Sequence, residues 1–198
     1  MAEMAAFATA GATTRSDTRS HSSLHTFTHM ERQPWTAHEF PLGIDPGWTS
    51  NVVNRLQGTV IRLKHYTFGL SDEEAARQDG GAWSIKQHVG HLIDLEDLHS
   101  SRLHEFKARK KELSAADMSN LRTEEADHNS KELEELVLEF ERIRNELLEL
   151  QASLEPDDLV HEAMHPRLKV VMKPVDMLFF TAEHDDHHLT TIARLLGQ

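Results

Sequence analysis

Apolar residues recur at helical spacing in four long stretches of the chain, which are separated by segments rich in Pro, Gly and polar residues. The stretches run from Asp45-Pro46 to about His65, from Ser84 to about Lys111, from about Ser130 to Leu154, and from Pro174 to about Leu196. In each, apolar residues three and four positions apart form one stripe, and polar or charged residues fill the opposite face. This pattern predicts four long amphipathic helices.

Signals for starting and stopping a helix flank these stretches. Pro46 and Pro174 stand at helix starts, where the missing N–H of proline costs little. Ser84 and Gln87 have the spacing of a capping box, and Gly197 can end the last helix. Because such helices bury their apolar stripes against one another, we expect an all-α protein, an up-down four-helix bundle.

Shorter elements and a tail complete the predicted organisation. Ser71 caps a short helix that ends before Gly80-Gly81, and residues 168–172 can form a short extended piece. Residues 1–33 are rich in Ala, Ser, Thr and His without sustained periodicity, so we expect a disordered tail followed by one domain over 34–198. Three histidines of this tail are spaced by four, but nothing apolar could dock them, and we interpret them as tail residues: His21, His25 and His29.

Composition narrows the classes of function. The chain of 198 residues has a net charge of −12, which disfavours nucleic acid as a partner because phosphate backbones need clustered Lys and Arg. Its apolar runs fall short of the roughly 18–20 residues of a membrane span, and its first residues lack a secretion signal. We therefore expect a cytoplasmic protein without membrane contact. Since the chain has no cysteine, any transition-metal site must use His, Asp and Glu.

A histidine pair in the fourth helix is the main candidate for chemistry. His184 and His188 are four residues apart, so on a helix they project side by side and can share one metal ion. On a helical wheel both fall in the apolar sector, whereas His187 falls in the polar sector and faces water. His91, flanked by apolar residues in the second helix, is the natural third ligand. For each of these three histidines, the alternative to a metal ligand is a buried side chain that only hydrogen-bonds a carbonyl. We assign structural or exposed roles to the remaining histidines of the second helix: His88, His99 and His104.

Three histidine ligands leave a metal ion with an open position, as in catalytic zinc sites, where a bound water has a pKa near 7. Asp94 or Asp185 could orient a ligand imidazole or the water. A literal H-E-x-x-H match occupies residues 161–165, but a protease motif needs a continuous helix, and Pro166 biases His165 away from helical backbone. We therefore reject a zinc protease.

Two segments together resemble the DinB/YfiT-like family of metal-dependent four-helix proteins. They are Trp83-Ser-Ile-Lys-Gln-His-Val-Gly-His-Leu-Ile-Asp94 and Ala182-Glu-His-Asp-Asp-His-His-Leu189, and the resemblance covers about residues 45–197. The family places metal-binding histidines at the positions of His91, His184 and His188. The resemblance implies a divalent ion of the zinc or nickel type, with iron and manganese as further options, and frequently a homodimer.

These observations leave three functions open. The leading one is a metal-dependent hydrolase that acts on a small-molecule substrate. Relatives that transfer small thiols to electrophiles suggest a second, in which an exogenous low-molecular-weight thiol is the nucleophile. The third is a metal- or ligand-binding module without catalysis.

Overall fold

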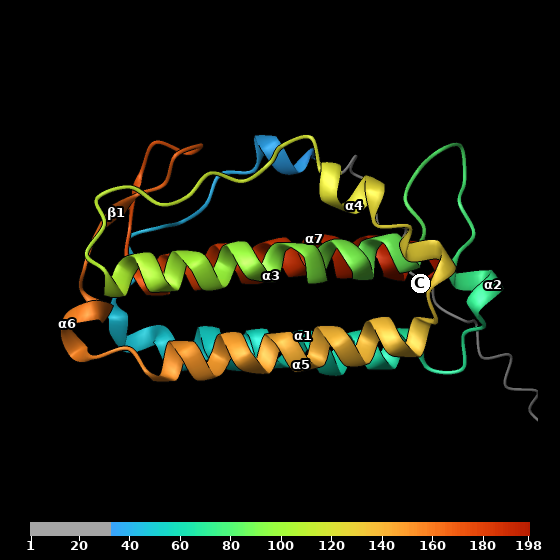
Figure 1. Ribbon diagram of the computed structural model, residues 1–198, viewed down its shortest axis with the longest axis horizontal. Coiled ribbons are helices and arrows are strands. Elements are labelled where there is room, and N and C mark those ends of the chain that lie inside the picture. The colour runs from blue at the N-terminus through green and yellow to red at the C-terminus, as the bar shows by residue number, and fades with distance from the viewer. Residues whose placement is uncertain (1–32) are drawn as a thin grey trace, which may run out of the picture. The chain divides into compact units, whose positions relative to one another are not determined.

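The computed structural model describes residues 33–198, and within them four long helices form a bundle (Figure 1). These helices are α1 (Thr49–Thr67), α3 (Ile85–Lys107), α5 (Leu133–Ala152) and α7 (Pro174–Leu195). They match the four stretches expected from the apolar pattern, so the all-α four-helix bundle is confirmed. The predicted tail, including His21, His25 and His29, lies outside the described residues.

The helix boundaries follow the predicted signals with one clear exception. Ser84 and Gln87 form the reciprocal capping box at the start of α3, and Pro174 opens α7. The exception is the end of α3, which comes at Lys107 and not near Lys111. The backbone turns left-handed at Arg109, and the segment after it pairs in extended form, with hydrogen bonds that link 111–113 to Met164. The helix therefore ends early because of the pairing between residues 111–113 and Met164, which the local sequence does not indicate.

Short elements connect the long helices. They are η1 (Trp35–Ala37), η2 (Pro46–Trp48), α2 (Asp72–Ala75), α4 (Leu121–Glu125), η3 (His128–Ser130), α6 (Pro156–Leu159), and a small antiparallel hairpin of β1 (Ala163–Met164) and β2 (Val171–Met172). The extended piece expected within 168–172 corresponds to β2. Helix α4 and the turn η3 have no counterpart in the sequence prediction.

The four helices do not strictly alternate in direction. Lys86 bonds the carbonyl of Lys131 near the starts of α3 and α5, and Lys107 bonds Ser153 at their ends, so these two helices run parallel. Likewise, the backbone just before η2 bonds Asp176 at the start of α7, and α1 runs parallel to α7 (Figure 1). The connection 108–132 is long enough to return along the whole of α3, which permits an up-down-down-up order in place of the expected up-down order.

A charged layer divides the apolar core of the bundle in two. One apolar cluster contains Leu56 and Leu147, and the other contains Val60 and Phe140. Between these levels lies the fully buried guanidinium of Arg144, which bonds two carboxylates from α3 and α7, those of Glu96 and Asp185. Thr59 of α1 also donates to Asp185, at 2.8 Å, so this layer joins all four helices. Because Asp185 accepts hydrogen bonds from both α1 and α5, these contacts restrain the rotation of α7 about its axis.

Gly90 marks a close approach in α3. A Cβ built at this position would lie 2.2 Å from the His128 ring. We expect Gly90→Ala to destabilise the protein by about 1–3 kcal/mol through overpacking, in spite of a helix-propensity gain of about 1 kcal/mol. Gly58 in α1 is the matched control because an added Cβ meets nothing within 4 Å, and Gly58→Ala should stabilise. Denaturant unfolding of both variants checks this, and equal effects would contradict it.

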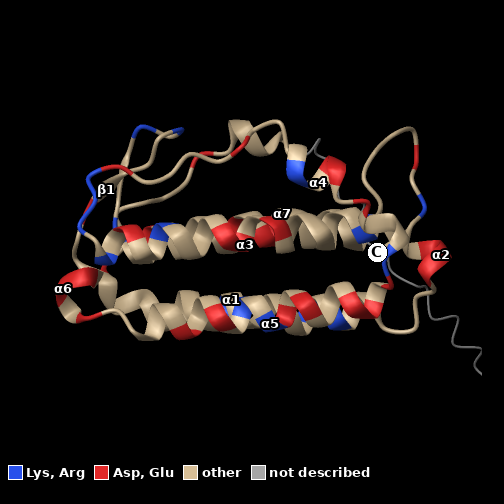
Figure 2. Cartoon of the chain, in the orientation of Figure 1, with Lys and Arg blue, Asp and Glu red and all other residues tan. Residues whose placement is uncertain are grey.

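Acidic and basic side chains are interspersed along α1 and α5 (Figure 2). Among the described residues, no helix is both long and apolar enough to cross a membrane.

Candidate metal centre

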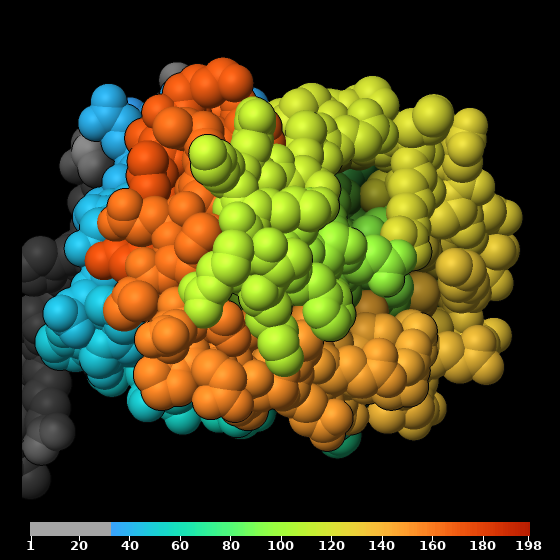
Figure 3. Space-filling model, turned by 60° about the vertical axis from the view of Figure 1, so that its left-hand side comes forward, coloured from blue at the N-terminus to red at the C-terminus, as the bar shows by residue number. Residues whose placement is uncertain are grey.

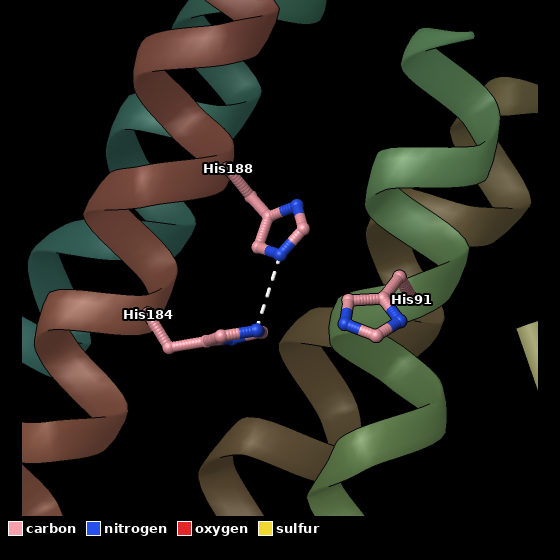
Figure 4. A group of neighbouring side chains, drawn as sticks. All are labelled: His91, His184 and His188. Carbon is pink, nitrogen blue, oxygen red and sulfur yellow. Dashed lines mark hydrogen bonds between the residues drawn. The ribbon is translucent and has the colours of Figure 1, made fainter. Parts of the chain in front are cut away.

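Three buried imidazoles meet between α3 and α7. His184 and His188 extend from successive turns of α7 toward the helix that carries His91 (Figure 4). One ring nitrogen from each lies within 4.8 Å of the others, and all three residues are buried. The Nε2 atoms of His184 and His188 are 3.1 Å apart. Two nitrogens that bind one tetrahedral zinc ion at about 2.0–2.1 Å would be about 3.3 Å apart, so this pair already has suitable spacing.

The hydrogen bonds of His91 determine which of its nitrogens is available. Thr123 of α4 donates its hydroxyl proton to the Asp94 carboxylate over 2.9 Å, and Nδ1 of His91 lies 3.0 Å from the same hydroxyl oxygen. Since the threonine proton is used, Nδ1 of His91 must donate, and Nε2 keeps its lone pair. A hydrogen-bonded carboxylate or hydroxyl behind a histidine ligand is typical of metal sites.

Asp94 is held as an anion behind this chain of hydrogen bonds. Its carboxylate also accepts a hydrogen bond from Nε2 of His128, at 2.9 Å, and lies 3.3 Å from Nε of Arg122. Burial alone would raise the pKa of Asp94, but hydrogen bonds from His128 and Thr123 outweigh burial, and the net pKa is lowered. The Asp94 carboxylate is therefore linked to the His91 ring through the hydroxyl of Thr123.

Burial keeps the three imidazoles neutral. It lowers the pKa of His91 to about 4, and it lowers the pKa of His184 and His188 well below the ordinary value. Neighbouring imidazoles lower the last two further. Only a neutral imidazole can bind a metal, so all three side chains are in the binding form at neutral pH.

His184 has a buried nitrogen that no described residue satisfies. Within residues 33–198, its Nδ1 has no hydrogen-bond partner, and its Nε2 lies 3.1 Å from Nε2 of His188. Leaving a polar atom unsatisfied in the interior costs about 1–3 kcal/mol. A divalent ion between the facing Nε2 atoms of His184 and His188 would take up both of their lone pairs, and the all-nitrogen donor set suits such an ion. The residues present therefore fit a metal of this class.

The three histidines open into a cavity of about 570 Å³ between α3 and α7. Trp83 packs on the His91 ring at a centroid distance of 4.8 Å, and Trp35 packs edge-on against His184 at 5.2 Å. The loop after α3 and the turn at 165–167 also contribute to the wall. A recess is visible on the surface between the loop that follows α3 and the segment around α4 (Figure 3). The cavity is large enough for a small molecule.

Two expectations for α7 are corrected by the structure. Asp185 does not contact a ligand imidazole, because its oxygens accept hydrogen bonds from Thr59 and Arg144. The helical wheel predicts that the His187 side chain is exposed to solvent. In the structure this side chain is half-buried and lines the cavity, and its ring lies 5.3 Å from that of His188. The loops that pack over α7 cover a helix face that the helical wheel predicts to be exposed to solvent.

The H-E-x-x-H match does not lie on a helix. Residues 163–164 form β1, and the His165 side chain accepts a hydrogen bond from the backbone of Leu168 within the hairpin. This geometry agrees with the rejection of the protease interpretation.

Three residues of the site were not identified from the sequence. Thr123 and His128 lie in a segment without helical periodicity and reach Asp94 only because the connection 108–132 folds back on α3. His88, which we treated as structural or exposed, is buried, and its Nδ1 lies 2.9 Å from Nδ1 of His188. Its spacing of three from His91 places both on one helix face and is the one signal that could have identified it.

Burial of neutral histidines makes stability depend on pH. Burial, followed by the charges of Arg144 and Arg102, lowers the pKa of His99 well below its ordinary value of about 6.5. The unfolded state then binds more protons below pH 6.5, so this stabilisation is complete above that pH and is lost as pH falls. We expect His99→Gln to reduce the pH slope of the unfolding free energy below pH 6 by up to about 1.4 kcal/mol per unit.

Urea unfolding of metal-free protein between pH 5 and 7.5 measures this slope. His104→Gln, on the exposed side of the same helix, is the control and should retain the wild-type slope. Equal slopes in both variants would contradict the assignment of His99.

The fold and the site define a class, the four-helix bundles with a histidine cluster for a metal at the interface of two helices. The model of the DinB superfamily matches residues 56–192, and the chain belongs to this superfamily. A solved structure, YfiT from Bacillus subtilis, is similar with a TM-score of 0.68 and 17% sequence identity over 80% of this chain and 91% of that one. That protein is described as a probable metal-dependent hydrolase with an unusual four-helix bundle topology. A search of curated proteins gives no match.

Proposed function

We propose that this protein is a metal-dependent hydrolase whose divalent ion is bound by His91, His184 and His188. The observation that carries the proposal is the convergence of three buried, neutral imidazoles on the wall of a small-molecule cavity. With three protein ligands, the ion keeps a position open toward the cavity. A closed structural site would need a fourth ligand.

An ion of this kind supplies a Lewis acid and lowers the pKa of a bound water to about 7. The chain's own residues supply orientation and exclusion of solvent. Asp94 and Thr123 hold the His91 ring, and His88 holds that of His188. Trp35 and Trp83 pack against the ligand rings and shield them from bulk water. Imidazole ligands suit zinc and nickel among other transition-metal ions, and we propose one of these two ions for the site.

His99 adds a hydrogen-bond acceptor to the cavity wall. The Thr181 hydroxyl donates to the carbonyl of Met177 at 3.0 Å, and Nδ1 of His99 lies 3.0 Å from that hydroxyl. Nδ1 of His99 therefore donates, and its Nε2 accepts. Because burial lowers the pKa of His99, this nitrogen can orient a substrate or a water but holds a proton poorly at neutral pH.

A turnover assay tests the proposal. Protein loaded with zinc or with nickel is incubated with small esters, amides and lactones, with and without an added low-molecular-weight thiol. We expect hydrolysis that does not depend on thiol, is lost on metal removal, and is absent in His188→Ala. Turnover only with thiol would support the transferase instead, and metal binding without any turnover would support a binding module.

A further inference from the structure

The cavity has a second polar end that the three histidines do not use. Arg102 of α3 is buried, with 2% of its surface exposed, yet among the described residues no carboxylate lies within 4.0 Å of its guanidinium. Its Nε and Nη2 donate to the carbonyl of Ser114 at 3.0 and 2.8 Å, and its Nη1 faces the sulfur of Met177. Glu105, on the same helix, is engaged with Ser114 and Lys110.

An unpaired buried arginine is costly and therefore informative. Buried charges are ordinarily paired, as Arg144 is with Glu96 and Asp185 in this same protein. Burial lowers the pKa of Arg102 to about 10, the charge of Glu105 opposes this shift only in part, and the group remains charged at neutral pH. A negative partner from outside the chain would supply the missing compensation.

Two further groups on the cavity wall near Arg102 have polar atoms for which the described residues offer no ion pair or hydrogen bond. Arg167 lies over the ring of Phe180, 5.7 Å from its centroid, and forms no ion pair with a described residue. His165 is 2% exposed, and its Nδ1 accepts the backbone N–H of Leu168 at 3.2 Å. Its Nε2 must then carry the proton, and this buried nitrogen has no hydrogen-bond partner in the part of the chain that the structure describes. A buried donor without an acceptor costs about 1–3 kcal/mol.

We infer that Arg102, Arg167 and the Nε2–H of His165 bind an oxyanion of the substrate, a carboxylate or a phosphate group. Two guanidinium groups and one N–H donor are the chemistry that recognises such groups. All three side chains line the same cavity as His91, His184 and His188. Oxyanion binding itself stands on these residues alone, whereas the conclusion that the anion belongs to a hydrolysed substrate rests on the proposed function.

The positions of the two ends limit the length of that substrate. Arg102 follows His91 by eleven residues on α3, about 16 Å of helix, and Met177 precedes His184 by seven residues on α7, about 10 Å. Because an arginine side chain is long, the distance from the guanidinium group to the three histidines is shorter than this separation along the helix. The substrate is therefore a small acid whose anionic group and reacting group are separated by several bonds.

Calorimetric titration of metal-free protein with glutarate, adipate and inorganic phosphate tests the subsite. We expect binding to wild type, and at least tenfold weaker binding to Arg167→Gln. This variant should fold because Arg167 forms no ion pair with any of residues 33–198. Arg194→Gln, which removes the same charge from an exposed position at the end of α7, should bind as wild type does. The stronger of the dicarboxylate and phosphate arms identifies the oxyanion.

His184→Ala separates this inference from the proposed function. Anion binding that persists in His184→Ala, together with loss of metal, supports the subsite whether or not any hydrolysis is found. Anion binding that needs a loaded metal and disappears in His184→Ala would show that the anion is a metal ligand and would overturn the subsite. Equal binding to wild type and Arg167→Gln would overturn it as well.

Discussion

Replacement of His184 by alanine should abolish stoichiometric binding of a divalent ion while the bundle remains folded. His184 contributes one of three nitrogens that lie within 4.8 Å of one another, and two imidazoles alone bind a metal weakly. The loss of affinity should exceed the roughly 10–100-fold that removal of an outer hydrogen-bond partner costs. Elemental analysis and metal titration of purified protein under metal-replete conditions measure it.

Thr123→Val provides the intermediate case in the same experiment. It removes the acceptor of the His91 Nδ1 proton and leaves the three imidazoles in place. We expect affinity to fall by about 10–100-fold, between wild type and His184→Ala. His104→Ala, on the exposed side of α3, should bind metal as wild type does. Wild-type protein that carries no ion, or His184→Ala that retains one, would refute the metal assignment.

Replacement of Arg144 by methionine should produce the largest loss of stability. The variant leaves Glu96 and Asp185 in the interior without their counter-charge. Removal of one partner from a buried ion pair typically costs about 3–5 kcal/mol, more than the hydrophobic gain from methionine restores. Burial already raises the pKa of Glu96, and without the opposing charge of Arg144 its carboxyl would take up a proton more readily.

Arg142 is the matched control because it lies two residues earlier on α5 and is exposed. Its ion pairs with described residues are those with Glu139 and Glu146, on the surface of the same helix. Exposed pairs of this kind contribute little, so Arg142→Met should leave the unfolding free energy nearly unchanged. Chemical denaturation compares the two variants, and comparable destabilisation by both would refute the stabilising role of the charged layer.

The long helices could be predicted from sequence because their information is local. Ser84 and Gln87 cap α3 through groups three residues apart, and apolar stripes identify the buried faces without knowledge of the partner helix. The pairing of His184 and His188 is local in the same sense, since residues four apart on a helix lie side by side in any fold. Errors arose where distant segments decide the structure, as at the end of α3, where residues 111–113 pair with Met164.

Helical periodicity could not reveal what the connections bring to the site. Asp185 and His184 are neighbours in sequence, yet the carboxylate turns to Arg144 and the imidazole to the cavity. Whether a buried side chain of α7 faces the bundle core or the cavity depends on which helices pack on either side of it. Thr123 and His128 carry no periodic signal, and a connection of 25 residues places them behind His91.

Helix periodicity is a property of residues three and four apart, so the amino-acid pattern was sufficient to predict an all-α bundle of four long helices and the three histidines that face its interior. Packing between distant segments sets the up-down-down-up order of the helices and the charged layer around Arg144, and it brings Arg102, Arg167 and His165 together at the far end of the cavity. These features depend on contacts between residues that are distant in sequence, and side-chain burial and pairing exist only after the helices have packed.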